Sequence, residues 1–105
     1  MAIANNINWQ LLVDTVEHFK KLGYKHVEVP WLVSEQAVRG TFSGNSVPAI
    51  QDLHLIGSGE QSFIQLELDS SLPPGKYVTL TPCFRDEDET DLHQLFFMKV
   101  ELYIS

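Results

Sequence analysis

Two stretches near the end of the chain alternate apolar and polar side chains with the two-residue period of a β-strand. In residues 77–84 one face carries Val78, Leu80 and Phe84, and in residues 95–104 the apolar face is unbroken. Successive side chains of a strand point to opposite faces, so each stretch predicts a strand with one apolar and one mixed face. We expect an antiparallel hairpin around the acidic turn between them, with its apolar face against a helix layer and its mixed face outward.

The mixed face of this hairpin combines side chains that suit a polar ligand. Arg85, Phe97, Lys99 and Glu101 can share one surface, and Glu87 can join them if the first strand continues slightly. Arginine offers a planar fork for phosphate or carboxylate, an aromatic ring can stack on a base, and glutamate can accept hydrogen bonds from an amine. Such a surface suits a nucleotide together with an amino acid. On spacing alone the plainer interpretation is favoured, that Arg85 only neutralises the acidic turn, because surface charge pairs are common.

The remaining segments predict an α+β fold. Residues 9–22 place apolar side chains at helical spacing and end at Gly23, which indicates an amphipathic helix. A short strand follows and breaks at Pro30, and Ser34 can cap a helix that reaches Arg39. The segment QSFIQLEL, residues 61–68, alternates and predicts another strand. We therefore expect an antiparallel β-sheet of about four strands with a flanking helix, residues 9–22, on one face.

Composition limits the class of protein and its partners. The 105 residues show no repeat or compositional boundary and are expected to form a single domain, residues 1–105. The formal net charge of −7 opposes broad nucleic-acid binding. A lone cysteine, Cys83, excludes an intramolecular disulfide and suits a reducing, cytoplasmic compartment, and no apolar run has the length of a membrane span. We therefore expect no membrane partner.

Three groups of residues that could carry other chemistry have plainer explanations. The acidic run in residues 86–91 lacks the glycine and terminal glutamate of a calcium loop. The four histidines are scattered without the spacing of metal ligands, so we expect no metal site. Cys83 has no identifiable base partner and is expected to be a small buried side chain rather than a nucleophile.

The hairpin carries a more specific signal in its sequence. The segment PCFRDE resembles motif 2 of the class II aminoacyl-tRNA synthetases, whose first strand has a phenylalanine, an arginine, any residue and a glutamate; Phe84, Arg85 and Glu87 match it. The segment FMKVEL is similar to the second strand of this motif in the seryl enzymes. The matching residues of this second strand are Phe97, Lys99, Val100 and Glu101. The segment PCFRDE also resembles the aspartyl enzymes, so the class is better indicated than the subclass.

Two upstream segments extend the resemblance in the order that the family has. Residues 9–33 look like motif 1, a long helix followed by a strand that ends at a proline, here Pro30. The segment LIGSGEQSF is similar to the part of seryl enzymes that recognises substrate with a threonine, any residue and a glutamate, and Ser58 and Glu60 occupy those places. With residues 77–105 as the motif 2-like hairpin, the resemblance implies a partial class II synthetase-like core.

The resemblance also implies a role for each matching residue. Arg85 would be the catalytic residue that holds the α-phosphate of ATP, with Glu87 at the adenine end and Phe97 stacked on the adenine. Glu101 and Glu60 would bind the amino acid, supported by Ser58. In that family a carboxylate attacks the α-phosphorus in line, so catalysis consists of positioning and charge neutralisation without a protein nucleophile.

The chain departs from the family pattern in two places. It ends before a counterpart of motif 3, the glycine-rich strand and helix that carry a second ATP-binding arginine, so we expect ATP, with or without Mg²⁺, to bind weakly or not at all. The turn that reaches tRNA in the family is short and acidic here, residues 86–94, and should repel tRNA. Motif 1 forms the dimer interface in the family, and the resemblance implies a homodimer through residues 9–33.

Three functions remain open at this point. The first choice is a partial core or paralogue with a remnant ATP and amino-acid site, which binds an aminoacyl-adenylate without full tRNA charging. A second is a non-catalytic dimerisation or protein-interaction module that kept the fold. A third is an active adenylate-forming ligase of protein biosynthesis, completed by another chain that supplies motif 3.

Overall fold

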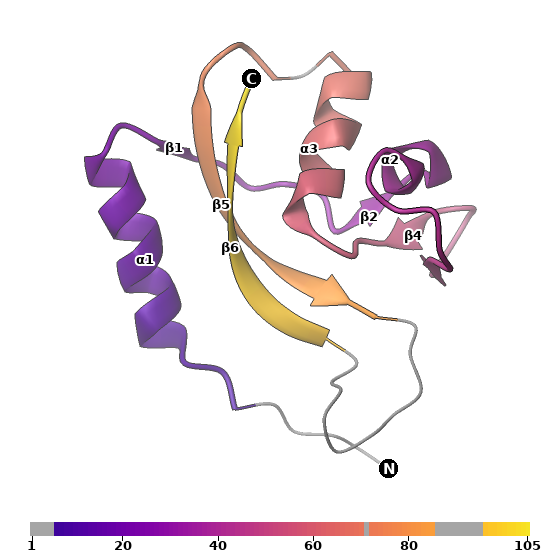
Figure 1. The fold of residues 1–105 in the computed structure, drawn as a ribbon, viewed down its shortest axis with the longest axis horizontal. Helices are drawn as coiled ribbons and strands as arrows, with labels where there is room; N and C mark the ends of the chain where they lie inside the picture. The colour runs from indigo at the N-terminus through magenta and orange to yellow at the C-terminus, as the bar shows by residue number, and fades with distance from the viewer. Residues whose placement is uncertain (1–5, 71, 86–95) are drawn as a thin grey trace.

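The computed structural model describes residues 6–70, 72–85 and 96–105 and has an α+β fold, as expected (Figure 1). The three helices and six strands of these described residues form a main sheet, a small second sheet and helices on both sides of the main sheet. The elements in chain order are α1 (Trp9–Lys21), β1 (Lys25–His26), β2 (Leu32–Val33), α2 (Glu35–Arg39), β3 (Val47–Pro48), β4 (His54–Leu55), α3 (Gly59–Leu68), β5 (Lys76–Phe84) and β6 (Phe96–Ile104).

The expected first helix is confirmed as α1. The side chain of Asn8 accepts a hydrogen bond from the backbone N–H of Leu11 at 3.0 Å and caps the first turn. Gly23 follows with a φ of 97°, a left-handed conformation that glycine adopts without strain, and the chain turns there toward β1. Val16 is the buried residue of this helix. Figure 1 shows α1 packed along one side of the β5–β6 hairpin.

The expected hairpin is confirmed, and it dominates the main sheet. β5 pairs with β6 in antiparallel register over nine residues each, from Lys76 opposite Ile104 to Phe84 opposite Phe96. β1 pairs with the other edge of β5 in parallel, so the order is β1-β5-β6. The main sheet is therefore mixed and three-stranded over the described residues, where a purely antiparallel sheet with more strands was expected.

The short helix α2 is also confirmed, and it lies beside the small sheet. The Ser34 hydroxyl accepts from the backbone N–H of Ala37 at 3.2 Å, which satisfies a donor in the first turn. The small sheet has the order β2-β4-β3 and is antiparallel throughout. Ile64 of α3 packs against this unit and joins a cluster formed by Val33, Ala37, Val38 and Ile56.

The expected strand at residues 61–68 is wrong, because this segment is part of helix α3. Its apolar side chains contact two different clusters: Ile64 faces the small-sheet unit, whereas Phe63 and Leu66 pack with Val29 and Tyr77. A helix buried on two sides shows no single apolar stripe, and over eight residues its sequence can imitate the alternation of a strand.

The position of α3 changes the environment of the hairpin. Helices lie on both sides of the β5–β6 ribbon, α1 on one side and α3 on the other, whereas the sequence predicted a helix on one face only (Figure 1). The mixed face does not point wholly outward, because α3 covers the part of it that carries Tyr77 and Tyr103. The aromatic ring of Phe63 stacks on Tyr103 with ring centroids 4.6 Å apart. Near the end of β5, among the described residues of this face, Arg85 is partly exposed and Phe97 and Lys99 are exposed.

Candidate functional site

Arg85 follows directly after β5 and is held by the backbone of two segments. Its Nη1 donates hydrogen bonds to the carbonyl oxygens of Gly57, at 2.6 Å, and Phe84, at 2.9 Å. Its guanidinium carbon lies 4.8 Å from the centre of the Phe97 ring, within the range of a cation–π contact. Arg85 therefore sits where the hairpin meets the turn before α3, and its orientation is defined by contacts within the chain.

A pocket of about 500 Å³ opens beside Arg85. Its volume is within the usual range for sites that bind small molecules and cofactors. Three of the six predicted site residues line it, namely Ser58, Glu60 and Arg85, and Lys99 of β6 joins them. The opposite wall is formed by α2 and the loop after it, residues 38–47. The structure thus brings Ser58 and Glu60 from the segment LIGSGEQSF and Arg85 from the segment PCFRDE to one pocket.

Ser58 and Glu60 reach the pocket because they lie at the beginning of α3. Ser58 is the N-cap residue of this helix, in extended conformation, and its side chain makes no capping hydrogen bond. Glu60 is exposed in the first turn, where a carboxylate interacts favourably with the helix dipole. Both residues therefore lie at the site although residues 61–68 form a helix rather than the expected strand. Ser58 precedes this helix, and Glu60 lies in its first turn.

Glu101 lies deeper, on the sheet floor beneath the start of α3. A Cβ atom at Gly59 would be 2.9 Å from Cβ of Glu101 and 3.2 Å from Oγ1 of Thr81, so only glycine allows the helix to approach this closely. Oε1 of Glu101 is 3.3 Å from Nζ of Lys99, an ion pair without hydrogen-bond geometry. Among the described residues, Oε1 of Glu101 and Oγ1 of Thr81 are buried oxygens without a hydrogen-bond partner. Such atoms are costly unless a ligand pairs with them.

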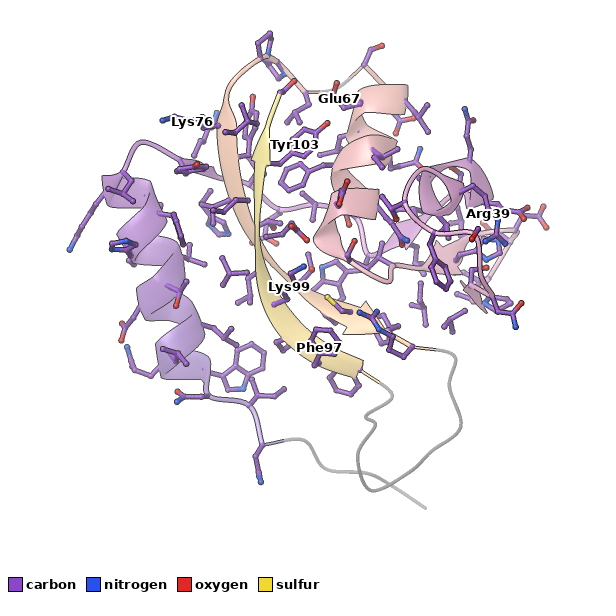
Figure 2. All side chains as sticks on the ribbon, in the orientation of Figure 1. Arg39, Glu67, Lys76, Phe97, Lys99 and Tyr103 are labelled. Carbon is purple, nitrogen blue, oxygen red and sulfur yellow. The ribbon has the colours of Figure 1, made fainter. Side chains whose placement is uncertain are left out.

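Phe97 shares the face of Arg85 but does not line the pocket. Figure 2 shows Phe97 and Lys99 on β6 near the end of the hairpin that is distant from Tyr103. The Phe97 side chain is exposed, and the Arg85 guanidinium covers part of its ring. Adenine stacking on Phe97 stays a prediction, since the guanidinium already occupies a place on this ring.

Cys83 lies on the same face, directly opposite Phe97 in the hairpin register. It is fully buried, as expected for a small core side chain. Burial raises the pKa of its thiol, and the nearby charges of Arg85 and Lys99 oppose this shift only in part. The thiol is therefore protonated near neutral pH, a state unsuited to nucleophilic chemistry.

Some predicted features cannot be placed, and some site residues were not predicted. Glu87 and the acidic turn lie outside the described residues. Gln61 and Thr41 were not predicted as site residues; Nε2 of Gln61 donates a hydrogen bond of 3.0 Å to Oγ1 of Thr41, which joins the pocket walls. A signal for Gln61 was present: Ser58 followed three residues later by glutamine is the spacing of a capping box, which marks a helix start. Thr41 had no such local signal.

No group of three or more histidine, cysteine, aspartate or glutamate side chains in residues 6–70, 72–85 and 96–105 is arranged to hold a metal ion. No helix in the same part of the chain has the length and apolar character to cross a membrane.

Comparison with curated proteins finds serine–tRNA ligases among the relatives of this chain. No protein-family model matches the chain. A serine–tRNA ligase of Methylacidiphilum infernorum is 36% identical over 91 residues, or 77% of this chain and 21% of the relative. The serine–tRNA ligases of Desulfurococcus amylolyticus and Coxiella burnetii are 32% and 31% identical over 90% and 97% of this chain. The chain spans 21% to 28% of the length of these relatives.

Comparison with solved structures gives the same architecture at lower identity. The cytoplasmic serine–tRNA ligase of Naegleria fowleri, solved in complex with AMP, aligns with 90% of this chain and 26% of its own, with a TM-score of 0.67 and 21% identity. PylSc of Desulfitobacterium hafniense, a pyrrolysyl-tRNA synthetase, aligns with 90% of this chain and 37% of its own, with a TM-score of 0.65 and 16% identity. At these identities the structural likeness establishes the fold.

Proposed function

We propose that this chain, a class II aminoacyl-tRNA synthetase-like core of partial length, keeps a remnant site for ATP and an amino acid and binds the aminoacyl-adenylate without charging tRNA fully. The observation that carries this proposal is the meeting of Arg85, Ser58 and Glu60 at one pocket. These residues come from two segments that resemble the nucleotide-binding and substrate-binding parts of the seryl enzymes. The AMP complex of the Naegleria relative supports a nucleotide as the ligand.

Arg85 is proposed to hold the α-phosphate. A guanidinium carries five N–H donors, and both hydrogen bonds to the described carbonyl groups use Nη1. A phosphate bound by such a fork gains charge-assisted hydrogen bonds, and the carbonyl contacts fix the direction of the fork beforehand. In this proposal Arg85 contributes positioning and charge neutralisation, with Glu87 and Phe97 at the adenine end.

The amino-acid end of the site is proposed to lie between Glu60 and Glu101. Among the described residues the buried Oε1 of Glu101 has an ion pair with Lys99 but accepts no hydrogen bond, and the ammonium group of an amino acid could donate one. Lys99, which lies beside Glu101, would neutralise part of the negative charge of the adenylate. Two cationic and two anionic side chains then surround a ligand that itself carries an ammonium and a phosphate. Ser58 supports this end from the helix cap.

A single domain of residues 1–105 acting in the cytoplasm is part of the same proposal, as is weak affinity for ATP alone. The net charge of −7 and the acidic turn oppose binding of a polyanion as large as tRNA. The adenylate carries one phosphate and so experiences less of this repulsion than ATP or tRNA. We therefore expect the adenylate to bind more tightly than ATP.

Titration calorimetry tests the proposal directly. Wild-type protein should bind a non-hydrolysable seryl-adenylate analogue saturably and more tightly than ATP or serine, because the analogue occupies both ends of the site. Amino-acid-dependent pyrophosphate exchange should be absent in the protein alone; exchange would favour the ligase interpretation instead. Failure of the analogue, ATP and serine to bind at millimolar concentration would end the proposal and leave an interaction module.

A second candidate, the dimerisation module, is favoured by exposed apolar side chains on α1 and β6. Trp9 and Val13 are 53% and 49% exposed and lie one helical turn apart, and Ile104 at the end of β6 is 66% exposed. Several exposed apolar side chains on a small domain are typical of an interface. We propose a homodimer that uses residues 9–33, as the resemblance implies.

Light scattering at micromolar concentration measures this association. Wild-type protein should have the mass of two chains, and Val13→Glu should have the mass of one, because a carboxylate in an apolar interface loses its hydration. Gln36→Glu, which adds the same charge on the exposed side of α2, should stay dimeric. A wild-type mass equal to one chain would contradict the prediction.

A further inference from the structure

Three hydrogen bonds in series connect the hairpin to the opposite wall of the pocket. Arg85 donates from Nη1 to the carbonyl oxygen of Gly57 at 2.6 Å. The backbone N–H of Gly57 donates to Oε1 of Gln61 at 2.7 Å, and Nε2 of Gln61 donates to Oγ1 of Thr41 at 3.0 Å. All four residues line the pocket. The guanidinium is thus coupled through one glycine and one glutamine to the loop after α2.

Gln61 is the central member of this series of hydrogen bonds, and its burial and two contacts restrict its side-chain conformation. Its side chain is 3% exposed, and both ends of its amide group have partners. The N–H of Gly57 requires an acceptor, so the amide oxygen must face Gly57 and the nitrogen must face Thr41. Loss of the amide would leave the Gly57 donor without this partner beside the pocket, at the cost of an unmade hydrogen bond.

Gly57 makes this support necessary. A glycine has no side chain to restrict its backbone, so the direction of its carbonyl depends on contacts made by other residues. The two backbone polar groups of Gly57 are held by Gln61 on one side and Arg85 on the other. If the first contact is lost, the peptide group before Gly57 is held by the hydrogen bond from Phe84 N–H to the Ile56 carbonyl, and the Gly57 carbonyl that orients Arg85 is less firmly fixed. A Cβ atom added at Gly57 would lie 3.6 Å from both side chains, so alanine fits there.

We propose that Gln61 is a positioning residue for the phosphate end of the site: through Gly57 it fixes the direction of Arg85, and through Thr41 it fixes the facing wall. This inference rests on the proposed function, since it presumes that Arg85 meets a phosphate. Gln61 acts on the guanidinium rather than on the ligand, so its loss should weaken binding of the phosphate and spare binding of the nucleoside.

The test compares AMP with adenosine by titration calorimetry. In wild-type protein AMP should bind at least about tenfold more tightly than adenosine, as a charge-assisted contact requires. Gln61→Leu, which has similar volume and no amide, should reduce this ratio roughly fivefold or more while the affinity for adenosine stays the same. Adding Gly57→Ala to Gln61→Leu should restore part of the ratio, because alanine restricts the freed backbone. A ratio unchanged in Gln61→Leu would overturn the proposal.

A milder pair of variants covers the case in which Gln61→Leu does not fold. Thr41→Val removes the hydroxyl that accepts from Gln61 at an exposed position, and Thr41→Ser keeps it. The valine variant should lower the ratio in the same direction and the serine variant should not. Equal ratios in both would contradict the role of the network.

A second readout separates this inference from the proposed function. In NMR spectra at low temperature the Arg85 Nη1–H signals, identified by their loss in Arg85→Lys, should exchange with water several-fold faster in Gln61→Leu than in the wild type, because Nη1 donates to the Gly57 carbonyl. This measurement needs no ligand, so failure of AMP to bind would end the proposed function while the exchange rate still decides the role of Gln61. An unchanged rate would refute that role.

Discussion

Replacing Phe63 with alanine should lower the free energy of unfolding by about 3–5 kcal/mol. Phe63 is fully buried, stacks on Tyr103 at 4.6 Å and lies 6.3 Å from the ring of Tyr77. It fills the space between α3 and the sheet, so truncation removes buried apolar area and leaves a cavity. Because a small domain is stable by only about 5–15 kcal/mol, the variant should be partly unfolded at moderate temperature.

Urea denaturation followed by circular dichroism measures this effect. The matched control is Phe42→Ala, since Phe42 is the same residue type and is 48% exposed. It should change the free energy of unfolding by less than about 1 kcal/mol, as is usual for exposed positions. A Phe63→Ala variant as stable as the control would mean that α3 does not pack on β5 and β6 as described.

Arg85→Ala should weaken binding of the seryl-adenylate analogue by roughly 10- to 150-fold, which corresponds to about 1.5–3 kcal/mol for a lost hydrogen-bonded charge contact. The guanidinium is the cation that both contacts Gly57 and lines the proposed phosphate end. Arg85→Lys should recover little of this affinity, because a lysine ammonium cannot reproduce the planar, two-donor contact of a guanidinium with phosphate. Binding is measured by calorimetry at fixed salt.

The control for charge is Lys76→Ala at the opposite end of β5. Lys76 is exposed and lies over the ring of Tyr24 at 5.2 Å, away from the pocket. Its removal changes the net charge by the same amount and should leave affinity within about twofold, since surface charges are screened over this distance. If Lys76→Ala weakens binding as much as Arg85→Ala, the effect of Arg85 is general electrostatics and no phosphate site exists there.

The fold was predictable wherever a local rule decides. The stop at Gly23, the cap at Ser34 and the two-residue period of the hairpin are all properties of neighbouring residues, and the structure has α1, α2, β5 and β6 where these features indicate them. The helix α3 was mispredicted because its packing partners, among them Val38 and Tyr77, are distant in sequence. Burial on two sides removed the one-sided pattern on which a helix is recognised.

The site was predictable to the same extent and for the same reason. Ser58, Glu60 and Arg85 were identified from short motifs, and they line the same pocket. Their predicted roles in binding stay predictions. Gln61 and Thr41 are joined only across the pocket, at a separation of twenty residues, and no local pattern marks such a pair.

The parallel pairing of β1 with β5 has a consequence for how the chain reaches this structure. The pairing joins Lys25 to Tyr77, so the whole segment between them, including the small sheet and α3, lies inside the loop that this contact closes. Antiparallel pairing of β5 and β6 closes a much shorter loop and costs less chain entropy. We expect the hairpin to assemble early and the N-terminal strand to dock last, which leaves one flank of β5 unprotected during the slowest step.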